Sequence, residues 1–246
     1  MNAVIASSRP AGSAAQRVAA LDWRGLSAQL DAGGSAVAGQ LLTPHECRAL
    51  AALYPVDRLF RSRVVMARHG FGSGEYRYFA YPLPADIAAL REAFYARLAP
   101  IANAWNERLA LEQRYPASHA EYLARCHAAS QTRPTPLLLK YGEGDYNCLH
   151  QDLYGEHVFP LQVAVLLSEP GEDFHGGEFV ITEQRPRRQT RVEVLNLRQG
   201  DAALFAVSHR PVQGARGTDR VNLRHGVSRL RSGERHTLGI IFHDAA

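Results

Sequence analysis

The sequence has few cysteines and no long apolar run, and each absence narrows the class of protein. Cys47, Cys126 and Cys148 are the three cysteines, and no two of them lie at a short paired spacing. This pattern argues against a disulfide framework and a cysteine zinc site, and it suits a reducing compartment, so we expect a cytoplasmic protein. No stretch approaches the ~20 apolar residues that cross a bilayer, so no membrane partner is expected.

Lysine is nearly absent as well, because only Lys140 among the 28 basic residues is a lysine. The arginines are concentrated toward the C-terminus. From residue 183 to 235 there are 12 arginines and 5 acidic residues, a net charge of +7, against +4 for the whole chain. Such a concentration is compatible with nucleic acid as a partner. A solvated arginine-rich hairpin would explain the same charge, so both interpretations stay open.

The first residues have no acidic side chain before Asp22 and lack the apolar block of a secretory signal. We expect residues 1–22 to be a flexible segment, with a transit peptide as the alternative. The hydrophobic content of 46% is typical of a globular chain, so we expect residues 23–246 to form one domain. In that domain, residues 23–133 are expected to give helical support and residues 134–246 the core.

Helix signals dominate the supporting part. Thr43-Pro44-His45-Glu46 has a capping residue, a proline at the first helical position and a glutamate three residues after the cap. Helical spacing runs from Pro84 to about Leu111, with a break or restart expected at Pro100. Ser118 and Glu121 repeat the capping spacing and predict another helix.

Short strand-like segments dominate the core. Two are expected earlier, over 59–67 and 75–81, and eight follow Pro134, most of them separated by turn residues. These eight cover residues 135–141, 146–150, 160–167, 177–183, 190–197, 202–207, 220–229 and 235–243. Helices followed by strands predict an α+β fold, and eight strands fit a jelly roll of the cupin type.

His150 and Asp152 lie two residues apart, so on a strand both would point to the same face. With His225 as a third ligand, the set becomes two histidines and a carboxylate. That set suits ferrous iron in an oxygenase, because it leaves coordination positions open for substrate and oxygen. His209, expected in a loop, and His236 are the rival third ligands. The alternative for His150, Asp152 and His225 is that they are polar core residues whose hydrogen bonds are satisfied within the protein.

Further motifs agree with this metal set. Gly176-Gly177-Glu178 opens one expected strand, the run 200–205 (GDAALF) forms another before His225, and Arg235 follows His225 by ten residues. On these motifs, residues 135–243 resemble the double-stranded β-helix core of the iron(II)/2-oxoglutarate-dependent dioxygenases. The resemblance implies iron(II) at His150, Asp152 and His225, with 2-oxoglutarate and O2 as co-substrates and ascorbate as a supporting reductant. It also implies that Arg235 and Tyr141 bind 2-oxoglutarate.

Over most of the chain after residue 40, the sequence is similar to a bacterial oxygenase family described as acting oxidatively on alkylated DNA. Residues 63–70, 222–229 and 241–244 carry this similarity. It implies a DNA-repair activity, the oxidative demethylation of nucleic acid. Against this, the second arginine that AlkB-type repair enzymes place after their Arg-x-x-Leu pattern is absent here.

Two alternatives remain at this stage. The Gly-Gly-Glu motif and the ten-residue gap to Arg235 resemble prolyl-4-hydroxylase-like enzymes, which implies hydroxylation of a peptide or a small molecule. A non-catalytic, cupin-like binding module that retains the fold is the other.

Overall fold

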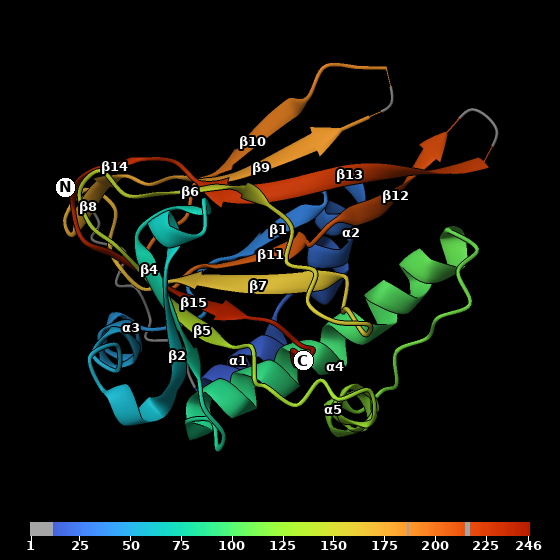
Figure 1. Cartoon of the computed structure of the whole chain (residues 1–246). Helices are drawn as coiled ribbons and strands as arrows, with labels where there is room; N and C mark the ends of the chain where they lie inside the picture. The colour runs from blue at the N-terminus through green and yellow to red at the C-terminus, as the bar shows by residue number, and fades with distance from the viewer. Residues whose placement is uncertain (1–11, 186, 215–216) are drawn as a thin grey trace, which may run out of the picture.

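Two antiparallel sheets face each other, and helices cover the outer side of one of them (Figure 1). The computed structural model describes residues 12–185, 187–214 and 217–246. The expected jelly roll is confirmed, since all eight strands predicted after Pro134 are present with slightly different ends. Every helix in the described part of the chain is too short or too polar to span a membrane.

The larger sheet has seven strands, and three of them come from the part of the chain expected to give helical support. In spatial order the strands are β1 (Ser35–Ala38), β11 (Ala202–Ala206), β7 (Leu161–Leu166), β15 (Arg235–Ile240), β5 (Leu137–Tyr141), β4 (Glu75–Phe79) and β2 (Phe60–Val65). Strands β7 and β11 are buried at every position. This burial follows from their place between the second sheet and the helices, and it explains their nearly continuous apolar sequence.

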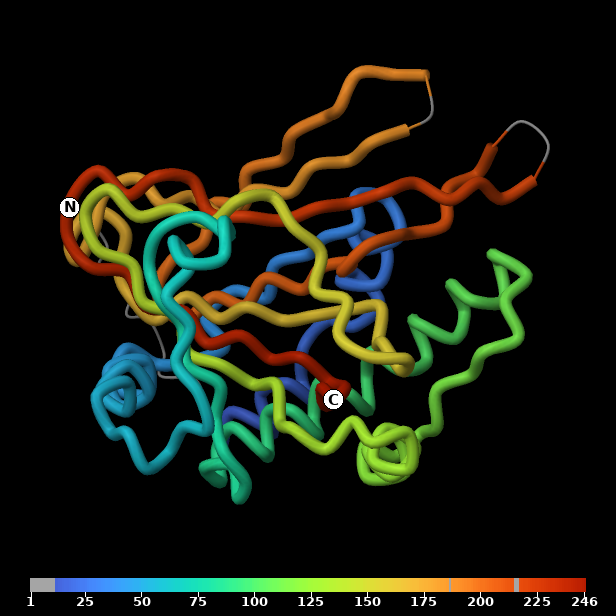
Figure 2. The backbone as a smooth tube through the Cα atoms, in the orientation of Figure 1, coloured from blue at the N-terminus to red at the C-terminus, as the bar shows by residue number. Residues whose placement is uncertain are grey.

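The smaller sheet carries the hairpins that extend beyond the body of the molecule (Figure 2). Its order is β10 (Arg191–Leu195), β9 (Phe179–Gln184), β13 (Gly217–Val227), β6 (Tyr146–His150) and β3 (Gly72–Ser73), with β12 (His209–Gly214) paired to β13. A separate pair is formed by β8 (Phe174–Gly176) and β14 (Leu230–Gly233). His209 was expected in a loop, and this was wrong, because it opens β12. Pro211 is tolerated there because β12 is an edge strand.

In the part of the chain that the structure describes, five α-helices precede the core strands. They are α1 (Ala14–Ala20), α2 (Trp23–Gly33), α3 (Pro44–Ala51), α4 (Ala85–Arg108) and α5 (His119–Ala128), with the short 3-10 turns η1 (Asp57–Leu59) and η2 (Met66–Arg68). The capping box at the start of α3 is confirmed, since Thr43 and Glu46 satisfy each other's backbone N–H groups. The second expected box is wrong, because the Ser118 side chain makes no capping hydrogen bond.

Two further expectations on the helical part need correction. Helix α4 continues through Pro100 without a break. Its buried side chains, such as Phe94 and Leu98 before the proline and Trp105 after it, hold it against the core, and this packing outweighs the lost backbone hydrogen bond. The expected flexible segment is ordered from residue 12, because Arg17 on α1 is buried and paired with Glu46 at 2.6 Å. Residues 1–11 lie outside the described residues.

A buried ion pair fixes the end of the chain to α4. Arg91 Nη2 lies 2.8 Å from Asp244 Oδ1, and both side chains are almost fully buried. Arg91 also donates to the backbone carbonyls of Ile241 and His243, so one guanidinium holds the segment that follows β15. Burial alone would raise the pKa of the Asp244 carboxyl, but the Arg91 charge and the hydrogen bond from His127 hold it below its ordinary value.

Replacing Asp244 with Asn should therefore destabilise the fold by about 3–5 kcal/mol, because it leaves a buried guanidinium without its counter-charge. Urea denaturation at neutral pH measures the change. A carboxyl with a lowered pKa contributes stability that is lost as the pH falls, so the gap between wild type and variant should narrow below about pH 4. Glu172→Gln, at an exposed site, is the control and should stay within about 0.5 kcal/mol of wild type. An unchanged stability in Asp244→Asn would contradict the role of the pair.

Candidate metal centre

His150, Asp152 and His225 converge at one point between the two sheets. His225 on β13 lies directly opposite His150 on β6, and their ring centroids are 4.2 Å apart. His225 Nε2 is 3.4 Å from Asp152 Oδ2, and His150 Nε2 is 3.5 Å from Asp152 Oδ1. The three potential ligand atoms all lie within 4.8 Å of one another. Among the described residues this is the one cluster of its kind, and it could hold a single metal ion.

The surroundings orient both imidazoles with Nε2 toward that point. His150 Nδ1 lies 2.8 Å from the carbonyl oxygen of Cys148, a contact that places the ring proton on Nδ1 and leaves Nε2 as the donor to a metal. The His225 ring packs between Phe205 and Phe179, at centroid distances of 4.6 Å and 6.0 Å. Burial lowers the pKa of His225 and so favours the neutral imidazole that a metal requires.

The Asp152 carboxylate is held from both sides. The Tyr154 hydroxyl donates to Oδ1 at 2.7 Å, and Gln162 Nε2 donates to Oδ2 at 2.9 Å. Burial alone would raise the pKa of Asp152, but the hydrogen bond with His225, the two nearby histidines and Gln162 hold it well below its usual range. Burial and the adjacent Asp152 charge raise the pKa of Tyr154, so its hydroxyl remains a hydrogen-bond donor.

Arg235 lines the same cavity. Within the described chain it forms no ion pair, and the Glu178 carboxylate acts on its charge only through space. It is 1% exposed, donates to Thr237 Oγ1 at 2.6 Å, and has a buried Nε without a hydrogen-bond partner. The rings of Tyr141 and Phe174 lie 5.6 Å and 5.8 Å from its guanidinium carbon. Burial lowers the pKa of Arg235 to about 10, which still leaves it charged at neutral pH.

These residues fit the cofactors that the sequence implies. The donor set of two imidazoles and one carboxylate suits iron(II), and the orphaned guanidinium suits one carboxylate of a dicarboxylic acid such as 2-oxoglutarate. Tyr141 is fully buried beside Arg235, and its hydroxyl accepts a hydrogen bond from Asn147 Nδ2 at 3.4 Å. The expected co-substrate residues and the expected metal ligands are therefore brought to one cavity.

The cavity has a volume of about 370 Å³. Aromatic and aliphatic side chains make up about half of its lining, and the aromatic ones are Phe71, Tyr76, Tyr78, Tyr141, Tyr154, Phe179 and Phe205. Phe71 is exposed at 48% and stacks on His69, which is typical of the mouth of a binding cavity. Apart from Asp152 and Arg235, the described lining carries no other carboxylate, lysine or arginine.

Other residues singled out from the sequence lie outside the cluster. His209 contacts Ser208, and His236 packs on Tyr54, so neither rival replaces His225. Arg224 is exposed, as the alternation along β13 predicts. Gln162 was missed, although a single glutamine inside the apolar run 161–166 (LQVAVL) is a signal for a buried polar role.

Comparison with solved structures supports this architecture. A 2OG-Fe(II) oxygenase-family oxidoreductase from Burkholderia pseudomallei superposes with a TM-score of 0.53 at 18% identity, over 92% of this chain and 93% of that one. A prolyl hydroxylase from Trichoplax adhaerens, solved with a hypoxia inducible factor peptide, gives 0.55 at 14% identity, over 92% and 90%. The chain shares the fold of these structures, and within that fold it places a His-Asp-His cluster that could hold a metal ion.

Sequence comparison then identifies the family. Residues 74–245 match the family model Oxygenase-NA, described as "Oxygenase, catalysing oxidative methylation of damaged DNA". Two uncharacterized proteins from Mycobacterium tuberculosis strains, MT2286 and Rv2227, are each 52% identical over 168 residues, which is 68% of this chain and 72% of theirs. The chain belongs to this oxygenase family.

The spacing of the two histidines depends on Gly226, beside His225. A Cβ atom at this position would lie 2.7 Å from the backbone oxygen of Asn147 and 3.2 Å from that of Cys148, both on β6. A side chain here would therefore push β6 away from β13.

We expect Gly226→Ala to weaken binding of Mn(II), a spectroscopic substitute for iron(II), by about tenfold, the scale on which altered ligand support weakens metal sites. It should also cost about 1–3 kcal/mol of stability through overpacking. Electron paramagnetic resonance of free Mn(II) and urea denaturation measure the two effects. Gly142→Ala is the matched control, since its Cβ would meet only Asp145 Oδ2 at 3.8 Å. Wild-type Mn(II) affinity in Gly226→Ala would show that the strand spacing is not required.

Proposed function

We propose that His150, Asp152 and His225 hold iron(II) and that Arg235 and Tyr141 bind 2-oxoglutarate in the same cavity. The observation that carries this proposal is the buried Arg235, which forms no ion pair in the described chain and lines the cavity that contains the three ligands. A buried cation is costly unless an anion joins it. Iron-dependent turnover of 2-oxoglutarate is what separates this enzyme from a non-catalytic, cupin-like binding module.

The chain's own residues position the reactants. Arg235 binds the distal carboxylate through its guanidinium, and the Tyr141 hydroxyl adds a donor beside it. Bound iron(II) with 2-oxoglutarate and O2 supplies the hydroxylation of a substrate C–H bond, with succinate and CO2 as co-products. The aromatic walls orient the substrate and exclude water from the reacting centre. No side chain is required as a nucleophile.

The substrate that we propose is alkylated nucleic acid, from which the enzyme removes a methyl group by oxidation. The family description and the aromatic cavity support it, because a flat base turned out of its strand is bound by stacking. Hydroxylation of an N-methyl group gives an N-hydroxymethyl product, which releases formaldehyde. The free cysteines agree with the cytoplasmic location that we propose for this reaction.

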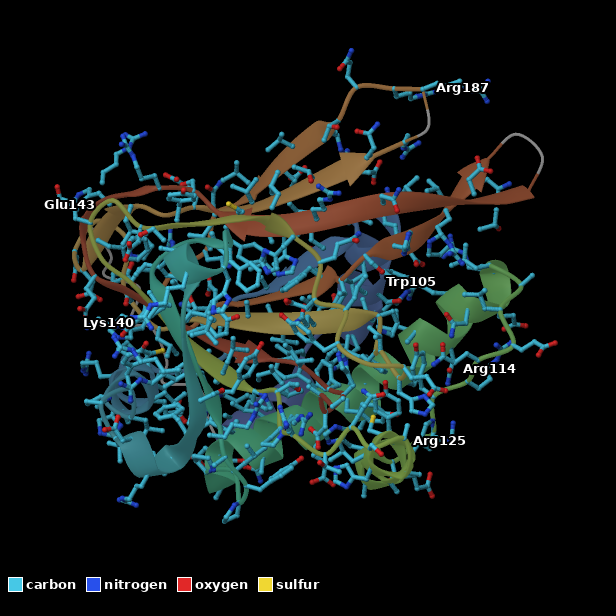
Figure 3. The ribbon with its side chains drawn as sticks, viewed as in Figure 1. Trp105, Arg114, Arg125, Lys140, Glu143 and Arg187 are labelled. Carbon is cyan, nitrogen blue, oxygen red and sulfur yellow. The ribbon has the colours of Figure 1, made fainter. Side chains whose placement is uncertain are left out.

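Part of the arginine excess between residues 183 and 235 is available to such a partner. Arg210 is buried and paired with Glu183, and Arg235 is in the cavity, so neither reaches the surface. Arg187 projects from the end of the β9–β10 hairpin (Figure 3), and Arg220 and Arg224 are exposed on β13. These exposed arginines could contact phosphates.

The deciding assay measures succinate from 2-oxoglutarate with iron(II) and ascorbate, with and without a single-stranded methylated oligonucleotide. We expect stimulation by the oligonucleotide together with formaldehyde, and no turnover in the His225→Ala variant, which lacks one ligand. An unmethylated oligonucleotide is the control. Turnover that depends on iron but ignores the oligonucleotide would reject the nucleic-acid substrate and favour a peptide or small molecule. Wild-type turnover in His225→Ala would reject the proposed ligand set.

Arg235→Met tests the co-substrate site separately. We expect 2-oxoglutarate affinity of the Mn(II)-loaded protein to fall roughly 100-fold, because hydrogen bonds to charged groups contribute about 1.5–3 kcal/mol each. The free energy of unfolding should fall by no more than about 0.5 kcal/mol, since an unpaired buried charge is removed. Calorimetric titration and urea denaturation measure the two effects, with the exposed Arg231→Met as control. A large loss of stability with unchanged affinity would assign Arg235 to the core instead.

A further inference from the structure

The three proposed ligands differ in how the fold holds them. His225 lies within β13, paired on both sides by β9 and β6, and His150 is the last residue of β6. Asp152 lies beyond the end of β6, in the irregular segment 151–160. The sheet therefore fixes the imidazoles but not the carboxylate, whose terminal torsion has a broad, shallow preference.

Two hydrogen bonds fix the Asp152 carboxylate, which the sheet does not hold. Tyr154 approaches Oδ1 of Asp152 from the same irregular segment, and Gln162 approaches Oδ2 from β7 of the opposite sheet. Gln162 is 4% exposed, and Asp152 is 7% exposed, so water competes weakly for these bonds. The two donors act on different oxygens from different directions, and together they fix the rotation of the carboxylate.

The segment that carries Tyr154 is itself braced. Gln131, 1% exposed and just after α5, donates from Nε2 to the backbone oxygens of His157 at 3.1 Å and Asp244 at 2.6 Å. Its Oε1 accepts a hydrogen bond from the His157 backbone N–H at 2.7 Å. One buried amide thus ties this irregular segment to the end of the chain, which Arg91 in turn holds to α4.

We propose that Tyr154 and Gln162 are positioning residues that set the orientation of the Asp152 carboxylate for metal binding. The inference rests on the proposed function, because it takes Asp152 as a metal ligand. Neither residue contacts the metal itself in this role. Each directs one carboxylate oxygen toward the point shared with His150 and His225. Asp152 Oδ1 lies 3.5 Å from His150 Nε2, and Asp152 Oδ2 lies 3.4 Å from His225 Nε2.

The test uses metal alone, without 2-oxoglutarate or substrate, so that effects on those ligands do not enter. We expect Tyr154→Phe and Gln162→Met each to weaken Mn(II) binding by about 10–100-fold, as loss of a hydrogen bond to a ligand does elsewhere. Electron paramagnetic resonance of free Mn(II) gives the affinity. Tyr146→Phe is the matched control, because it removes an exposed hydroxyl from β6, the strand that carries His150, and its Mn(II) affinity should equal that of wild type.

A second readout separates positioning from a general structural role. The visible absorption of the Co(II)-loaded protein reports ligand geometry, and it should change in Tyr154→Phe and Gln162→Met while the melting temperature of the metal-free proteins stays near that of wild type. If wild type binds no Mn(II), the proposed function fails. If wild type binds Mn(II) and both variants bind it equally well, the positioning role fails and the proposed function stands. Equal weakening of Mn(II) binding in Tyr146→Phe would also overturn the positioning role.

Discussion

The register between β6 and β13 is the constraint on which the site depends. His150 and His225 are direct partners in this antiparallel pair, so their imidazoles leave the sheet on the same face. A slip of one residue would turn His225 outward and Arg224 inward, because the side-chain period of a strand is two. The other edge of β13 is fixed by six pairings with β9. The two histidines therefore face each other because β6, β13 and β9 pair in one fixed register.

The buried arginines differ in whether the fold provides each of them with a carboxylate partner. Arg91, Arg210 and Arg235 are each 1% exposed. The first pairs with Asp244 and the second with Glu183, whereas the third forms no ion pair within the described chain and contacts a hydroxyl and aromatic rings. Paired charges can be kept for structure alone, but an unpaired one lowers stability unless a ligand completes it. The absence of an ion pair at Arg235, in contrast to Arg91 and Arg210, is therefore the strongest electrostatic indication of an anion site.

Much of the site followed from sequence because its information is local. The His-x-Asp pair, the strand before His225 and the ten-residue gap to Arg235 carry the resemblance to the dioxygenase core, and the structure places His150, Asp152, His225 and Arg235 along one cavity. Where a feature depends on tertiary packing, the prediction from sequence was wrong or the feature was missed. Helix α4 passes through Pro100 because the core holds both of its halves, and Gln162 meets Asp152 only when two sheets close on each other. Neither effect is visible in spacing.

The distribution of charge also constrains how a nucleic acid would be bound. In the described lining, the only carboxylate is Asp152 and the only arginine is Arg235, and most other lining side chains are aromatic or aliphatic. The cavity can therefore accept an uncharged ring but has no free cation for a phosphate. Backbone contacts must come from outside it, where Arg220 and Arg224 lie on the exposed face of the same strand that carries His225. Because one strand would then align the backbone and also supply a metal ligand, its register would set how far a reactive base extends into the cavity.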